Sequence, residues 1–281
     1  MRFAILTGIV AISGLSQGML LPLLAMLLDE SGVSSTVNGA HAAALYIGVL
    51  AISPFLEHPL GKYGYKPMII MGGFIVICSL ILFPLFSSFF LWLVIRFFIG
   101  MGDHMLHFAT QTWITDFSPP AERGRRLSLY GLAFGLGFTA GPLLASLASI
   151  NEALPFYLAA LLSFIGWIAV FCLPNEKPKA FERSSSAAGR WIGAWKYAWP
   201  ALLLPLAYGF LEAAIHSVFP LYALHKRMSA EQITLILPFF SFGGIIFQLP
   251  LGALSDRFGR RVAITGALLA GISCFLTALV V

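Results

Sequence analysis

Apolar runs of about 20 residues recur along this chain of 281 residues, and they restrict its possible folds more than any other feature. Each run is long enough to cross the hydrocarbon layer of a membrane as a helix, which is roughly 30 Å thick. Only 10% of the residues are charged, against about 25% in a typical soluble domain. The sequence therefore predicts an all-α integral membrane protein and argues against a large soluble protein with buried helices.

We predict nine membrane spans, each with ends accurate to several residues. They cover residues 4–28, 38–60, 67–87, 90–115, 127–149, 153–174, 200–224, 232–254 and 262–281. The basic residues fall at the ends of these runs, so the net charge of +5 does not indicate a nucleic-acid partner. They concentrate on the side of the N-terminus, which the positive-inside rule assigns to the cytoplasm. This pattern predicts a multi-pass protein of the plasma membrane.

A repeat with one constant offset joins the two ends of the chain. The segments at Gly14 and Gly209 are similar, and so are the turns at Gly64 and Gly259: 209 − 14 = 195 and 259 − 64 = 195. Duplicated helical units are typical of secondary transporters. Since 281 − 195 = 86, the second copy ends about halfway. We expect three domains: a six-helix half (1–175), a linker (176–199) and an incomplete three-helix second half (200–281).

The linker is the longest polar stretch, and it holds three tryptophans spaced four residues apart. With basic residues beside them, Trp191, Trp195 and Trp199 indicate a helix lying in the lipid headgroup region. The alternative is that these aromatic residues simply begin the seventh span.

Four local patterns, in this order and topology, resemble the major facilitator superfamily. They are the fourth-helix arginine motif at 96–102, the following cytoplasmic loop at 119–125, the fifth-helix glycine motif associated with antiporters, and the signature loop at 252–261. The phrase LYIGVLAISPF followed by GYKPMI is similar to a bacterial drug-efflux branch. The resemblance implies two pseudo-symmetric halves of six helices, of which about nine are present. It also implies a truncated chain that works as a monomer.

The resemblance assigns conformational gate loops to both halves. The first comprises Glu57, Gly61, Lys62 and Gly64, and the second comprises Gly252, Asp256, Arg257, Gly259, Arg260 and Arg261. We expect Gly259 to adopt a positive φ and Asp256 to meet a helix N-terminus or an arginine. The arginines contact lipid headgroups or simply fix the topology. We hypothesise that Glu57 stands in for the aspartate that the first loop lacks.

The fifth-helix motif consists of small residues, which allow helices to approach closely. We expect packing roles for Gly131, Gly135, Gly137, Gly141 and Pro142, with the proline bending the end of its helix.

Ionisable residues within the spans mark the candidate transport site, because a lone charge in the bilayer is costly. Glu212 lies near the middle of the seventh span, with His216 one turn away; its counterpart in the repeat is Gln17 (212 − 195 = 17). Asp103 and His107 lie on one helix face, with Arg96 two turns earlier.

These residues have two interpretations each. Glu212 couples protons or binds a cation, or it makes a buried structural hydrogen bond. The stripe on the fourth span relays protons, or it is a polar cluster that satisfies itself. A metal site with His104 is disfavoured, because that side chain points to another helix face.

We therefore expect a proton-coupled transporter that exports a small amphipathic or cationic molecule by alternating access. The alternatives are a proton symporter for a nutrient and a non-transporting membrane fragment. We expect no cofactor, no metal and no enzyme activity, because the sequence contains no HExxH motif and no evident cluster of metal ligands. A nucleotide-driven pump is disfavoured, since the sequence has no P-loop motif.

Overall fold

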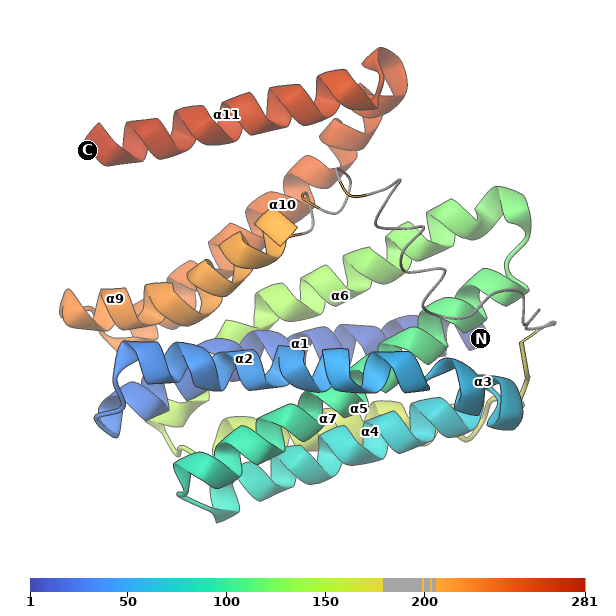
Figure 1. The fold of residues 1–281 in the computed structure, drawn as a ribbon, viewed down its shortest axis with the longest axis horizontal. Coiled ribbons are helices and arrows are strands. Elements are labelled where there is room, and N and C mark those ends of the chain that lie inside the picture. Colours follow the sequence, from blue (N-terminus) through green and yellow to red (C-terminus); the bar gives the residue numbers. More distant parts are fainter. Residues whose placement is uncertain (179–198, 200–202, 204–205, 281) are drawn as a thin grey trace. The chain divides into compact units, whose positions relative to one another are not determined.

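The structure is a computed structural model that describes residues 1–178, 199, 203 and 206–280. This part of the chain is helical and contains no strand, so the predicted all-α class is confirmed. Residues 206–213 are also helical, and they lead into the π-helix η5 (Ala214–Val218). The other helices are α1 (Arg2–Glu30), α2 (Ser35–Ile52), α3 (Glu57–Tyr63), α4 (Tyr65–Leu82), α5 (Phe89–Phe117), α6 (Arg123–Ala145), α7 (Leu154–Val170), α9 (Phe219–His225), α10 (Ala230–Phe258) and α11 (Arg260–Val280) (Figure 1).

Among the described residues, six helical stretches are long and apolar enough to cross a membrane. They are Arg2–Glu30, Ser35–Phe55, Tyr65–Leu85, Phe89–Phe117, Arg123–Ser149 and Ala230–Phe247. Leu154–Val170 and Arg261–Thr277 are shorter apolar helices at two further predicted spans. Trp191 and Trp195, on which the expected headgroup helix depends, lie outside the described residues.

The second span ends earlier than the sequence predicts. We expected it to reach residue 60, but α2 ends at Ile52 and a separate short helix, α3, begins at Glu57. Pro54 and Pro59 explain the break, because a proline cannot donate the backbone hydrogen bond that a continuous helix requires. Pro59 is tolerated in the first turn of α3, where that donor has no helical partner.

Two glycines with a positive φ separate the helices at the repeated turns. Gly64, between α3 and α4, has φ 95°, and Gly259, between α10 and α11, has φ 88°. Other residues adopt this conformation at a cost, so both turns depend on glycine. The expected positive φ of Gly259 is confirmed, and the two glycines 195 residues apart have similar φ angles (259 − 64 = 195).

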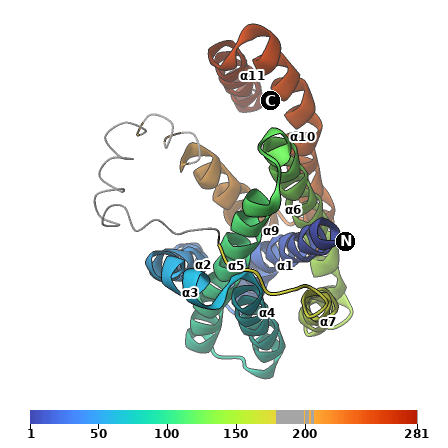
Figure 2. The same ribbon diagram turned by 90° about the vertical axis from the view of Figure 1, so that its right-hand side faces the viewer.

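The chain forms two compact units, residues 1–238 and residues 239–281. In the first unit, α1 packs against α6 and α7, α5 packs against α2 and α4, and α4 also packs against α7. Figure 2 views these helices from the end where the N-terminus and α3 lie. Helix α9 and the π-helix contact α1 within the same unit. The domain boundaries predicted at 175 and 199 stay a prediction.

Helices α1 and α6 pack backbone to backbone through glycines. A Cβ added at Gly14 or Gly18 would collide with the α6 backbone at Phe134 and Phe138. In return, a Cβ at Gly137 or Gly141 would collide with the α1 backbone. The contact is therefore a seam of four glycines in which neither helix has room for a side chain.

This seam confirms close approach for only part of the predicted glycine motif. A Cβ at Gly131 would have nothing within 4 Å in the described structure, so the packing role expected for Gly131 is wrong. This glycine is exposed, because the seam lies nearer the other end of α6. The carbonyl of Gly135 accepts a hydrogen bond from the Thr139 hydroxyl, and Pro142 is buried inside α6.

We predict opposite effects of alanine at two glycines of α6. Gly141→Ala should destabilise the protein by about 1–3 kcal/mol, since the new methyl group meets the backbone of α1. Gly131→Ala, the matched control, should leave stability unchanged or raise it by up to about 1 kcal/mol through helix propensity. Thermal unfolding in detergent measures both, and equal midpoints for the two variants would refute the seam.

Candidate functional site

Asp103 is the centre of a buried hydrogen-bond cluster in the first unit. Its side chain on α5 accepts hydrogen bonds from the Ser13 hydroxyl and the Gln17 amide, both on α1. His107, one turn further along α5, places Nε2 3.4 Å from Oδ2 of Asp103. Asp103 is only 7% exposed, so these partners replace water around the carboxyl group.

His107 extends the cluster to α6. Its Nε2 lies 3.0 Å from the Ser13 hydroxyl, and its Nδ1 lies 2.6 Å from the Tyr130 hydroxyl. The Tyr130 oxygen lies 3.0 Å from Oγ1 of Thr110, back on α5. Asp103, His107 and Thr110 share one helix face because they are four and three residues apart. Polar groups from three helices thus form one connected network.

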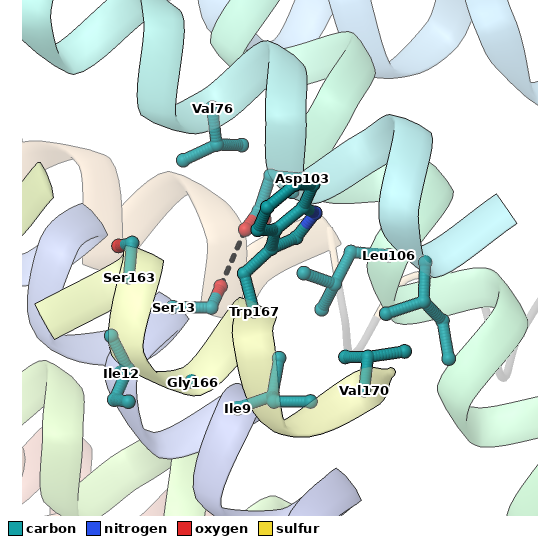
Figure 3. A pocket seen from close by; sticks show the side chains of 12 residues that line it. Ile9, Ile12, Ser13, Val76, Asp103, Leu106, Ser163, Gly166, Trp167 and Val170 are labelled. Carbon is teal, nitrogen blue, oxygen red and sulfur yellow. Dashed lines mark hydrogen bonds between the residues drawn. The ribbon is translucent and has the colours of Figure 1, made fainter. Parts of the chain in front are cut away.

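A small cavity adjoins the carboxyl group of Asp103. Figure 3 shows Ser13, Asp103 and Ser163 around it, with the Trp167 indole at its wall. Its volume is about 20 Å³, which is room for about one water molecule. The remaining lining is mostly apolar, so the Asp103 carboxyl group and two serine hydroxyls are the polar part of an otherwise apolar cavity.

Arg96 does not join this cluster, contrary to the predicted stripe. Its Nη1 lies 3.3 Å from Nδ1 of His41 on α2, and both side chains are fully buried. Seven residues of helix separate Arg96 from Asp103 by about 10 Å along the axis, and the Arg96 side chain is paired with α2. His104 also turns to that side, with Nε2 2.9 Å from the Ser53 hydroxyl.

Glu212 and His216 belong to the same compact unit but have different surroundings. The Glu212 carboxyl group is half-buried and interacts electrostatically with Tyr46 of α2 and with Tyr208. His216 is buried in the π-helix, and its ring packs edge-on against Phe138 of α6 at 4.7 Å. A proton shared between Glu212 and His216 stays a prediction. Gln17, the counterpart of Glu212 in the repeat, donates its amide to Asp103.

The first gate loop is held by the segment that follows α7. The amide of Tyr65 donates to the carbonyl of Glu176 at 2.9 Å, and the Asn175 amide donates to the carbonyl of Tyr63 at 3.0 Å. The carboxylate of Glu176 pairs with Arg2 at 2.7 Å and accepts the Trp113 indole N–H at 2.9 Å. We call these contacts the Glu176 clasp, since one residue joins α1, α4 and α5.

The remaining gate residues lie in α3 and around the turn between α10 and α11. Glu57 and Gly61 lie in α3, and a Cβ at Gly61 would have nothing within 4 Å. Lys62 stacks on Tyr63, and Arg257 stacks on Phe258. Arg261 is exposed at the start of α11. The side chains of Asp256 and Arg260, and the surroundings of Gly252, lie outside the described part, so the roles of the second loop stay predictions.

Sequence reasoning missed Ser13, Tyr130 and Glu176. Ser13 and Tyr130 are common residues without a formal charge, and only tertiary packing brings them to Asp103 and His107.

Among the described residues, no group of three side chains is arranged to hold a metal ion.

Long apolar helices around a buried carboxyl and imidazole network define a multi-pass membrane protein with the architecture of a transporter. The family described as Major Facilitator Superfamily matches this chain over residues 6–281. The chain therefore belongs to the major facilitator superfamily, a family of membrane transporters.

Three curated relatives match most of the chain. The uncharacterized MFS-type transporter YfkF of Bacillus subtilis is 48% identical over 99% of this chain and 72% of its own length. Multidrug resistance protein 2 of the same organism is 25% identical over 99% of this chain and 75% of its own. The quinolone resistance protein NorA of Staphylococcus aureus is 24% identical over 84% and 62%.

Solved structures share the fold. A bacterial homolog of the human lysosomal transporter Spinster, inward-facing and unoccupied, matches with a TM-score of 0.72 at 15% identity. The match covers 92% of this chain, which spans 63% of that protein. A D-xylose–proton symporter matches with a TM-score of 0.66 at 14% identity, covering 92% of this chain and 70% of its own. At such low sequence identity, these matches support a shared fold and nothing further.

We predict that Glu176→Gln loosens the clasp. Because the ion pair with Arg2 is partly exposed, its loss should cost about 0.5–1 kcal/mol. Trypsin should then cleave after Lys179 roughly two- to fivefold faster, since the bond between Lys177 and Pro178 resists trypsin. Glu122→Gln is the matched control, since its pair with Arg126 is local to the start of α6. Unchanged cleavage in Glu176→Gln would show that the carboxylate does not hold this segment.

Proposed function

We propose that this transporter couples the movement of protons to the export of small amphipathic or cationic molecules. The buried Asp103 is the observation that carries the proposal, since its carboxyl group is bonded to α1 and α5 together. A change in its protonation changes the bonds between these two helices. Protonation of this one carboxyl group thereby alters the contact between α1 and α5, which alternating access must rearrange.

Glu212 is the proposed site for the cationic part of the substrate. Its half-buried carboxylate interacts electrostatically with Tyr46 and Tyr208. A carboxylate and tyrosines in one region suit an amphipathic cation, because the carboxylate attracts positive charge while aromatic rings accept apolar surface. The names of the relatives, multidrug resistance protein 2 and quinolone resistance protein, support this class of substrate.

We propose the plasma membrane as the location, with the N-terminus in the cytoplasm. The N-terminus, α3 and the start of α6 lie at one end of the first unit (Figure 1). Arg2, Lys62, Lys66, Arg123 and Arg126 gather there, and we call it the basic end. The positive-inside rule places this end in the cytoplasm. The proposed unit of function is the monomer.

Uptake of a nutrient with protons is the alternative. A D-xylose–proton symporter shares the fold, and a fold does not fix the direction of transport. The same Asp103 would then bind a proton that moves inward with the substrate.

The test uses everted membrane vesicles with a preset proton gradient, to which cationic dyes and amphipathic drugs are added. We expect a transported compound to dissipate the gradient with the wild-type chain. Asp103→Asn and Glu212→Gln should reduce this signal at least about tenfold. Glu231→Gln is the matched control, an exposed carboxylate at the start of α10, and it should behave as wild type. Full activity of Asp103→Asn would refute proton coupling at this residue.

A further inference from the structure

The hydroxyl of Tyr130 contacts the ring nitrogen of His107 that faces away from Asp103. The other ring nitrogen, Nε2, lies 3.4 Å from Oδ2 of Asp103. Tyr130 is 4% exposed and holds its oxygen 2.6 Å from Nδ1 of His107. The direction of this hydrogen bond decides which nitrogen of the neutral ring carries the proton.

The contacts of Thr110 set the direction of the hydrogen bond between Tyr130 and His107. Its Oγ1 lies 2.8 Å from the carbonyl of Leu106 and 3.1 Å from that of His107, and carbonyls can only accept. A hydroxyl has a single donor, so a Thr110 hydroxyl that points at these carbonyls must accept from Tyr130 at 3.0 Å. Tyr130 then has no hydrogen left for His107 and accepts one from Nδ1. The side chain of Gln111 also interacts with Tyr130, and it fits this arrangement by donating an N–H to the Tyr130 oxygen.

The other side of the ring then requires one more proton. Ser13 contacts both Asp103 and Nε2 of His107, but its hydroxyl has one hydrogen for two hydrogen bonds. The second hydrogen comes from a protonated Asp103, or from Nε2–H of a doubly protonated His107. In both cases the Asp103–His107 pair holds one proton beyond Nδ1–H, and its net charge is zero.

We propose that Tyr130, oriented by Thr110, is a positioning residue that fixes the Nδ1–H form of His107, so that Asp103 and His107 hold one exchangeable proton. The transport role of that proton rests on the proposed function above. Without the Tyr130 hydroxyl, the neutral ring can move its hydrogen to Nε2. Nε2–H then donates to an ionised Asp103 or to Ser13, and the pair holds no further proton.

A few polar groups from the neighbouring helices face the Asp103–His107 pair. From α1, Ser13 and Gln17 face the pair, and from α6 Tyr130 does. His104 on α5 faces the other way, toward Ser53 at the end of α2. In the part of the chain that the structure describes, no Lys, Arg, Asp or Glu side chain outside the pair forms an ion pair with Asp103 or His107.

Nitrogen-15 NMR of histidine-labelled protein in lipid tests the proposal, because it distinguishes protonated from unprotonated ring nitrogens. The His107 signal is assigned by its loss in His107→Asn. We expect a protonated Nδ1 in the wild type and a shift of the hydrogen to Nε2 in Tyr130→Phe. Tyr65→Phe is the matched control, since that buried hydroxyl bonds to Asp116 outside the cluster, and it should leave His107 unchanged.

A second pair of variants keeps the test decisive if Tyr130→Phe does not fold. Thr110→Val should shift the hydrogen toward Nε2, whereas Thr110→Ser, which retains the hydroxyl, should preserve the wild-type ring. An unprotonated Nδ1 in the wild type, or a ring that neither Tyr130→Phe nor Thr110→Val alters, overturns the proposal. The NMR experiment needs no transported compound, so its failure is distinct from a failed vesicle assay.

Discussion

The burial of one carboxyl group imposes the arrangement around it. A carboxyl group inside a membrane bundle needs hydrogen-bond donors or a proton, since no water surrounds it. Ser13, Gln17 and His107 meet this need for Asp103, and two of them come from α1. The position of α1 against α5 is therefore tied to the chemical state of Asp103.

The glycine seam between α1 and α6 makes this network possible. Helix α1 contacts α6 through Gly14, Gly18, Gly137 and Gly141. It also contacts α5 through the bond between Ser13 and Asp103. With α1 as this common partner, Tyr130 on α6 lies close enough to His107 on α5 to share a hydrogen bond. At the basic end, the Glu176 clasp holds α1, α4 and α5 together by partly exposed contacts. The buried part of the bundle thus depends on close packing, and the end depends on weaker, reversible pairs.

Sequence patterns predicted the features that depend on local chemistry. Apolar runs located most spans, and the repeat paired Gly64 with Gly259, whose shared positive φ the structure confirms. The sequence also placed Asp103 and His107 on one helix face. It could not reveal Ser13 and Tyr130, because their contacts join residues 90 and 23 positions apart. Helical spacing grouped Arg96 with Asp103, yet the long guanidinium side chain pairs with His41 of α2. Gly131 failed as a packing residue because the seam does not reach it.

The most direct test of a proton-binding Asp103–His107 pair is an infrared difference spectrum of the wild-type protein between acidic and alkaline pH. The other acidic residues and histidines titrate in both proteins, so their bands cancel when the difference spectrum of Asp103→Asn is subtracted from that of the wild type. We predict that this subtraction leaves paired carboxyl and imidazole bands. A subtraction that leaves no such bands would contradict the account, because the exchangeable proton would then belong to other groups.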